Sequence, residues 1–382
     1  MKQRVSQVES PKSEAKNRNT APHSPSPVPS RLPSTVYRLL APLLFVVITA
    51  LLTGCTPTPP PPPPPVPRPN VVIVVEGTAQ LKRAGWKAYS PVAFGALLQY
   101  DDLLEVDGRV QILCGDLTVR TLKSGRDSCP CPPWEGAFTA GGAAYRNVPQ
   151  NVPYIQHPRN TLVLEVEPLL RWHDTRASGY TVAVVQGGRT LWQQTGVTGA
   201  TLDYPPAAPP LQPGVDYLLR VQDEDSGVSS DEDPARGIGF RLIAPAQQAA
   251  LEVHCAPVNT LPDLDDAARD YALALCYATW EPEGGGRGPW GAAWLLLETV
   301  AQTYDAPAVH LWIGDLLAQM QSPDALAAYR MALTRAEVFG DLESQAAAYA
   351  GLWRMTRNDN YREQARNLYM QLGDMVVLEN LN

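Results

Sequence analysis

The stretch "SPDALAAYRMALTRAEVFGDLESQAAAYAGLW", residues 322–353, contains two helical patterns separated by a turn. Leu326 and Tyr329 recur on one face at the helical period, and the same period returns after the turn. Gly340 followed by Asp341 is typical of a helix end next to the N-cap of another helix. The stretch therefore predicts two consecutive helices that pack against each other.

The same helical period continues on both sides of this stretch, so residues 246–382 are expected to form an all-α domain. Asp263 is expected to cap the first helix, and the glycine-rich segment 283–289 is expected to separate that helix from the next. Ser322 and Pro323 favour an N-cap and first turn, and Gly373 favours a C-terminus.

Two groups of small and aromatic residues repeat along this domain. Ala325, Tyr329 and Ala332 share their spacing with Ala365, Tyr369 and Leu372, and Gly314 and Gly351 occupy the small-residue place 37 residues apart. The region resembles tetratricopeptide repeats, whose usual period is about 34 residues. The resemblance implies stacked helical hairpins with a concave face that binds a peptide or protein.

Aromatic residues on these helices are the candidates for partner binding. At helical spacing, however, aromatic residues belong to a core more often than to an interface. The candidates are Trp290, Trp294, Trp312, Tyr349 and Trp353.

Residues 71–155 are expected to form an all-β domain, because Val71 to Leu122 alternate between apolar and polar residues with Gly and Asp at the turns. This segment resembles the FecR-like domain of bacterial envelope proteins, although its usual Gly-Asp and Asp-Gly pairs are altered or inverted here. The residues that fit that pattern are Gly77, Arg83, Gly95, Leu98, Asp102, Val110, Ile112, Gly115 and Asp116.

Residues 156–245 contain strands at the spacing expected of a β-sandwich. The segment Leu211-x-Pro-Gly-x-x-Tyr217 resembles the tyrosine corner of fibronectin type III and immunoglobulin-like domains, in which Trp172 would be the buried tryptophan of an early strand. The expected fold class is therefore a multidomain chain with an all-β N-terminal half followed by an all-α helical-hairpin domain.

The N-terminus carries an export pattern. Residues 1–38 are rich in Ser, Pro and basic residues and are expected to be disordered, whereas Leu39–Thr53 is apolar and free of charge. Leu52, Thr53, Gly54 and Cys55 follow directly and resemble the lipobox of bacterial lipoproteins. The resemblance implies cleavage after residue 54 and a lipid on Cys55; an uncleaved single-pass anchor is the alternative.

Residues 55–70 are expected to form a lipid-anchored tether, since the proline run from Pro59 to Pro65 favours a stiff polyproline II conformation. Removal of residues 1–54 would take away seven basic and two acidic residues and leave a formal net charge of −13. Nucleic-acid binding is disfavoured by that charge.

The sequence holds six cysteines, of which five lie beyond the anchor. In an oxidising compartment these residues favour disulfides, with Cys255 paired to Cys276 and Cys114 paired to either Cys129 or Cys131. A bridge between Cys129 and Cys131 would be strained, and a metal site built on three cysteines lacks a neighbouring histidine.

We find no catalytic or cofactor-binding motif in the sequence. The histidines are isolated, and no serine elbow or phosphate-binding loop is present. The acidic run Asp223–Asp233 does not match an EF-hand loop, so a solvated hairpin is favoured over calcium binding. We expect no enzyme activity, no metal and no cofactor.

These features predict a non-enzymatic lipoprotein that is held on the outer face of a membrane and binds envelope proteins through its helical repeats. In a cell with two membranes, the outer membrane is one location, because Thr56 replaces an aspartate that retains some lipoproteins at the inner membrane. Two alternatives stay open: a FecR-type envelope sensor and a glycan-binding or wall-binding module. The sequence leaves the oligomeric state open.

Overall fold

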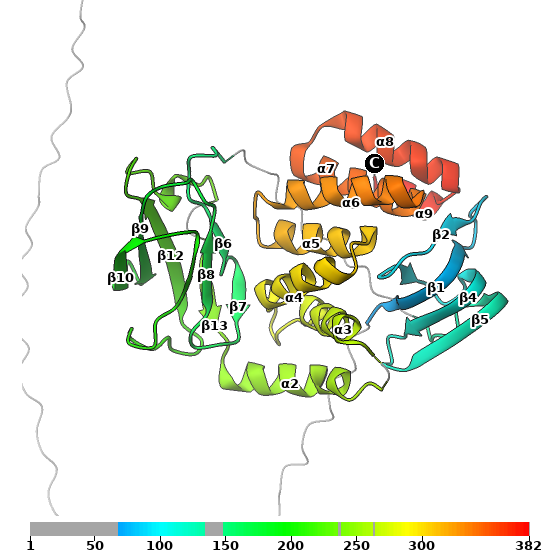
Figure 1. Ribbon diagram of the computed structural model, residues 1–382, viewed down its shortest axis with the longest axis horizontal. Coiled ribbons are helices and arrows are strands. Elements are labelled where there is room, and N and C mark those ends of the chain that lie inside the picture. The colour runs from blue at the N-terminus through cyan, green and yellow to red at the C-terminus, as the bar shows by residue number, and fades with distance from the viewer. Residues whose placement is uncertain (1–67, 134–147, 236–237, 263, 382) are drawn as a thin grey trace, which may run out of the picture. The chain divides into compact units, whose positions relative to one another are not determined.

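The computed structural model describes residues 68–133, 148–235, 238–262 and 264–381, all within one compact unit, Pro65–Asn382 (Figure 1). Strands occupy its first part and helices its last, which confirms the expected order of β followed by α. The leader, the lipobox residues Leu52–Cys55 and the proline run lie outside the described residues.

The first sheet has the strand order β2-β1-β4-β5, with β3 also paired to β1, and all its pairs are antiparallel. At the start of β1, Val71 and Ile73 pack in one apolar cluster and Val72 in another, so both faces of the sheet are covered there. Its strands are β1 (Asn70–Lys82), β2 (Ser90–Pro91), β3 (Leu97–Leu98), β4 (Leu103–Leu113) and β5 (Val119–Ser128).

Two further sheets enclose a second core. Their strand orders are β10-β9-β12-β13-β7 and β11-β8-β6, and Leu170, Val182 and Val221 of these sheets pack in one apolar cluster. The strands are β6 (Ile155–His157), β7 (Thr161–Val163), β8 (Leu169–Trp172), β9 (Tyr180–Gln186), β10 (Arg189–Val197), β11 (Thr201–Asp203), β12 (Asp216–Asp223) and β13 (Phe240–Leu242).

Trp172 and Tyr217, which the sequence singled out, are both buried in this second core. Trp172 is fully buried against Tyr180, with ring centroids 5.5 Å apart. The backbone N–H of Gln212 donates a hydrogen bond of 2.7 Å to the hydroxyl of Tyr217, and this bond fixes the turn that leads into β12. Trp172 of β8 and Tyr217 of β12 therefore contribute buried aromatic rings to this core from the two sheets.

The C-terminal region is helical. Helices α5, α6, α7 and α8 each contact the next helix in the chain, as the hairpin pattern predicts. The helices are α2 (Pro245–Asn259), α3 (Asp266–Thr279), α4 (Trp290–Thr303), α5 (Pro307–Gln319), α6 (Ala325–Phe339), α7 (Leu342–Thr356), α8 (Asp359–Leu372) and α9 (Met375–Asn380). Among the described residues, no helix is long and apolar enough to cross a membrane.

Some helix boundaries differ from the expected ones. Asp263 lies outside the described residues, and the N-cap of α3 is Asp265, whose carboxylate accepts a 2.7 Å hydrogen bond from the N–H of Ala268. Helix α6 begins at Ala325 with Asp324 before it, and the hydroxyl of Ser322 accepts a 3.3 Å hydrogen bond from the N–H of Asp324, so Ser322 caps the turn that leads into the helix. The predicted turn is confirmed: Gly340 has a positive φ of 69° and Asp341 caps α7.

The first sheet shares its apolar core with the helices. Val72 and Leu81 of β1 pack in one cluster with Ala350 of α7 and Tyr369 of α8. A second cluster joins Phe94, in the loop before β3, to residues of α3–α6. The face of the helices that the sequence assigns to an external partner is therefore partly covered by the β strands of the same chain.

Candidate functional site

A cavity of about 380 Å³ lies where the first sheet meets the helices. Its walls are mainly apolar, but charged groups from α5 and α7 also face it. The lining residues are Leu81, Ser90, Pro91, Ala96, Leu97, Ala308, Leu311, Trp312, Asp315, Asp341, Glu343, Ser344, Ala347, Ala350, Trp353, Arg354, Tyr369, Val377 and Leu381.

Close helix packing positions the first charged pair of this cavity, Asp315 and Arg354. The ring of Tyr329 on α6 lies against Gly314 on α5 and Gly351 on α7. Its hydroxyl then reaches α5 and donates a 2.6 Å hydrogen bond to Asp315, which also forms a 3.3 Å ion pair with Arg354 of α7. The two glycines thus bring three helices together around one carboxylate.

The first sheet contributes a second charged group. Arg83, in the loop after β1, forms ion pairs with Glu343 of α7 and with Asp102. Its guanidinium also donates a 2.8 Å hydrogen bond to the carbonyl of Leu97. Arg83 therefore links the sheet to the start of α7 through buried charge.

Asp341 is held by the N-terminus of α7. Its carboxylate accepts hydrogen bonds of 3.1 Å from the N–H of Ser344 and 3.3 Å from the hydroxyl of Ser90. No ion pair joins Asp341 to a basic side chain in the described part of the chain, so its negative charge is balanced by the helix N-terminus and by hydrogen bonds.

Burial dominates the electrostatics of these carboxylates. Desolvation raises the pKa of Asp102, Asp315 and Asp341, although nearby hydrogen-bond donors and arginines oppose the shift. Desolvation also raises the pKa of Glu343 to about 7, against the opposing effect of Arg83. Asp102, Asp315, Asp341 and Glu343 thus lie near only two pairing arginines, Arg83 and Arg354, among the described residues, and burial favours their protonated forms.

The aromatic residues proposed from the sequence are divided between core and cavity. Trp294 is 2 % exposed, with the guanidinium of Arg171 5.0 Å from its ring centroid, and Trp312 is 4 % exposed. We therefore assign the body of both rings to the core rather than to an open binding face. Trp312 still borders the cavity, as does the half-buried Trp353.

The remaining two candidates lie away from the cavity lining. Trp290 begins α4 and is half-buried, and its ring packs against the apolar core formed by α3–α6. Tyr349 of α7 is half-buried, with its ring centroid 6.2 Å from that of Tyr361 of α8. The structure thus brings Trp312 and Trp353 together at one cavity and leaves Trp290 and Tyr349 outside it.

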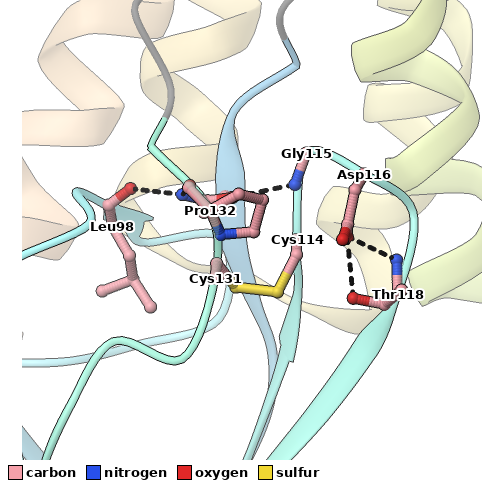
Figure 2. The surroundings of a disulfide bond; sticks show 8 residues. Leu98, Cys114, Gly115, Asp116, Thr118, Cys131 and Pro132 are labelled. Carbon is pink, nitrogen blue, oxygen red and sulfur yellow. Dashed lines mark hydrogen bonds between the residues drawn. A yellow bond between two sulfur atoms is a disulfide. The ribbon is translucent and has the colours of Figure 1, made fainter.

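The cysteines beyond residue 55 form two disulfides, Cys114–Cys131 and Cys255–Cys276, and leave Cys129 as a buried thiol. Figure 2 shows the first bridge, which joins the end of β4 to the segment after β5. The side chain of Asn70 supports it, because its amide donates to the carbonyl of Pro132 and its oxygen accepts from the N–H of Gly115.

Burial makes the free thiol of Cys129 unreactive. Its thiol is 3 % exposed, and desolvation raises its pKa. Among the described residues, His254, Cys255 and Cys276 are close enough to share a metal ion, but both sulfur atoms of this group belong to a disulfide. The oxidised protein therefore offers no thiolate at this place.

The acidic run Asp223–Asp233 organises its own loop. Asp223 accepts hydrogen bonds from the N–H groups of Asp225 and Ser226, and Asp233 forms a buried 2.8 Å ion pair with Arg159. These carboxylates are already engaged in turn formation and in packing. The run forms the end of β12, a turn and the 3₁₀ helix η1 (Ser230–Glu232), and Asp223 and Asp233 are buried rather than solvated as expected.

A second cavity of about 400 Å³ lies beside α3 and α4, and its mainly apolar lining also includes Glu165 and Thr299. His157 borders it, and burial lowers the pKa of this imidazole to about 4. The imidazole is therefore neutral at physiological pH, and the charged residue that lines this cavity is Glu165.

Sequence reasoning found part of the first cavity. It singled out Trp312, Trp353, Arg83 and Asp341, each for a different reason, but it did not bring them together. It missed Glu343 and Arg354, because isolated charged residues on an amphipathic helix are typical of a solvated face. Only contacts between segments far apart in the sequence reveal their ion pairs.

Comparison with protein-family models found no match for the chain, and comparison with curated proteins found none either. The function is therefore inferred from the residues themselves.

Proposed function

We propose that this protein is a non-enzymatic, lipid-anchored scaffold on the outer face of a bacterial membrane that binds an envelope protein partner. The observation that carries the proposal is the cavity of about 380 Å³ between the first sheet and helices α5 and α7. A cavity of this size, with apolar walls and a few fixed polar groups, has the character of a ligand site.

The location rests on the sequence. The apolar run 39–53 and the residues Leu52-Thr53-Gly54-Cys55 support export and lipid attachment, and the proline run supports a spacer between the lipid and residues 71–382. Two disulfides are consistent with an oxidising compartment. A lipid on Cys55 would hold the cavity at the membrane surface.

The anchor is tested by processing and fractionation of the full chain. With Cys55→Ala or globomycin treatment, we expect an uncleaved precursor or release of the protein from membranes. Ser124→Ala, an exposed substitution on β5, is the control and should leave processing intact. Normal processing and membrane association of the Cys55 variant would refute lipid attachment.

The binding role is tested by cross-linking in envelope extract with the whole mature chain as bait. The helices should not be used alone, since they share their core with the first sheet. Ala347→Leu would place extra bulk in the cavity, whereas Ala327→Leu adds the same bulk to an exposed site on α6. We expect loss of a specific partner only with Ala347→Leu; equal capture by both variants would argue against the cavity as the binding site.

A further inference from the structure

We propose that the cavity between the first sheet and α5–α7 receives one lysine or arginine side chain of the partner protein. This inference rests on the proposed function, because it names the part of the partner that the scaffold holds. Three features carry it: the volume of the cavity, the excess of carboxylates over guanidinium groups in its lining and its apolar walls.

The charges that line the cavity do not balance. Three carboxylates, Asp315, Asp341 and Glu343, and one guanidinium, Arg354, border it. Arg83 approaches Glu343 from the sheet, but it also pairs with Asp102, one oxygen of which is buried with no hydrogen-bond partner among the described residues. A cation entering the cavity would therefore neutralise charge that the protein leaves uncompensated.

The spacing of the carboxylates favours an organic cation over a metal ion. In the described part of the chain, Asp315, Asp341 and Glu343 do not form a group whose oxygens all lie within 4.8 Å of one another. A metal ion would need them to converge at its ligand distances. An ammonium or guanidinium group instead donates hydrogen bonds in several directions and can bridge separated acceptors.

The apolar walls match the rest of such a side chain. Leu81 and Leu97 from the sheet and Leu311 and Trp312 from α5 contribute hydrocarbon and aromatic surface beside the carboxylates. Lysine and arginine combine an apolar stem with a charged end, and an aromatic ring adds attraction for the cation. The guanidinium groups of Arg357 and Arg362 lie 5.7 and 5.6 Å from the ring centroid of Trp353, another aromatic residue that lines the cavity.

The volume also fits a single side chain. About 380 Å³ corresponds to roughly a dozen water molecules at their share of liquid volume. This space holds a long side chain with a few waters, whereas a folded segment of the partner would have to remain outside. The cavity would therefore select an exposed basic residue on an extended segment or loop.

The probes are N-acetyl-lysine amide, N-acetyl-arginine amide and the uncharged N-acetyl-norleucine amide, titrated calorimetrically into the full chain. We expect the two cationic probes to bind at least tenfold more tightly than norleucine. Equal binding of all three probes would show an apolar pocket only, and no binding of the cationic probes would also overturn the proposal. This comparison needs no variant and therefore does not depend on how a variant folds.

Charge-removing variants then assign the site. Asp341→Asn keeps an efficient N-cap, and Glu343→Gln keeps an oxygen that accepts a hydrogen bond from Arg83, so both should fold. Each should weaken the cationic probes several-fold, whereas Glu363→Gln on the exposed surface of α8 should have no effect. An equal loss with Glu363→Gln would show nonspecific attraction and refute the site.

The outcomes separate this inference from the proposed function. If the envelope partner is captured by Asp341→Asn and Glu343→Gln as well as by the wild type, the scaffold role stands and the basic-side-chain inference fails. If the probes bind but no envelope partner is captured, the cavity chemistry stands and the scaffold role fails.

Discussion

The ring of Tyr329 on α6 lies so close to the backbone of Gly351 on α7 that a Cβ atom on the glycine would come within 2.5 Å of it. Tyr329 is 1 % exposed. Its ring lies similarly close to Gly314 of α5, where an added Cβ atom would come within 2.7 Å of the ring. The small residues therefore allow a close approach of the helices, and this approach places Asp315 and Arg354 at the cavity.

Gly351→Ala should destabilise the protein. Alanine in a helix is normally favoured over glycine by about 1 kcal/mol, but overpacking a tight core costs about 1–3 kcal/mol. Because the contacting atoms belong to a rigid ring, we expect the overpacking to dominate. Urea unfolding would show a lower midpoint with an unchanged m-value.

The double variant with Tyr329→Leu is the control for this prediction. Leucine removes the ring that meets the new methyl group, so Gly351→Ala should cost less in that background. An identical cost in both backgrounds would show that the ring does not limit the residue at position 351.

Glu343 should make stability depend on pH. Burial raises its pKa from 4.5 to about 7, so the folded protein binds this proton more tightly than the unfolded chain. The stability that Glu343 contributes is therefore fully present below pH 4.5 and is lost as the pH rises to about 7. We expect a loss of about 1–3 kcal/mol over this range.

Glu343→Gln should flatten this part of the profile, since glutamine cannot release a proton. Chemical unfolding between pH 5 and pH 8 measures the slope, and Glu363→Gln on the exposed surface of α8 supplies the matched control. Asp102, Asp315 and Asp341 also titrate in the wild type and in Glu343→Gln. The test is therefore the difference between the two proteins in the slope of unfolding free energy against pH. A slope that Glu343→Gln leaves unchanged would contradict the assigned burial of this charge.

The helix boundaries and the close packing of helices could be predicted, because the sequence patterns that indicate them lie within or beside the helices themselves. Gly340 and Asp341 mark a helix boundary through backbone conformation and capping, and both act as predicted. The spacing of Tyr329, Gly314 and Gly351 likewise predicts helices that pack closely, and the structure places these three residues in contact. Each of these patterns is read from neighbouring or regularly spaced residues.

The cavity could not be predicted, because it depends on contacts between segments far apart in the chain. Arg83 and Glu343 are separated by 260 residues, and neither carries a sequence signal for burial. Helix α2 was also missed, since Pro245–Asn259 has weak helical periodicity and contains Pro257.

The pairing of Cys114 with Cys131 can be separated from pairing with Cys129 by single substitutions. Cys114→Ser removes the bridge and should cost about 3 kcal/mol, given the 17-residue separation of the paired cysteines. Cys129→Ser should retain the bridge and most of the stability, because it changes a buried free thiol to a residue of similar size.

Peptide mapping without reductant gives the direct measurement. In wild type and Cys129→Ser, Cys114 should be linked to Cys131, which tandem mass spectrometry distinguishes from Cys129 on the same peptide by fragment ions that separate the two residues at Pro130. A link between Cys114 and Cys129 in the wild-type protein would contradict the observed pairing, as would equal destabilisation by the two substitutions.

The buried pair of Arg159 and Asp233 should hold the β-sandwich region against the helices. Its atoms are 2.8 Å apart, both side chains are 3 % exposed, and Arg159 also donates to the carbonyls of Met320 and Gln321 before α6. Arg159→Met would leave Asp233 buried without its partner, which typically costs about 3–5 kcal/mol. Arg171→Met is a matched control, because Arg171 pairs with Glu298 of α4 at 2.6 Å but both side chains are about one-third exposed.

We expect the control substitution to cost about 1 kcal/mol or less, since solvent screens an exposed pair. Thermal unfolding followed by near-ultraviolet circular dichroism would compare the two variants with the wild type. Adding Asp233→Asn to Arg159→Met should recover part of the loss, because it removes the uncompensated charge and keeps the hydrogen bond that Asp233 accepts from Ala235. If both arginine substitutions cost the same, burial of the Arg159–Asp233 pair does not determine how firmly the sandwich is joined to α5 and α6.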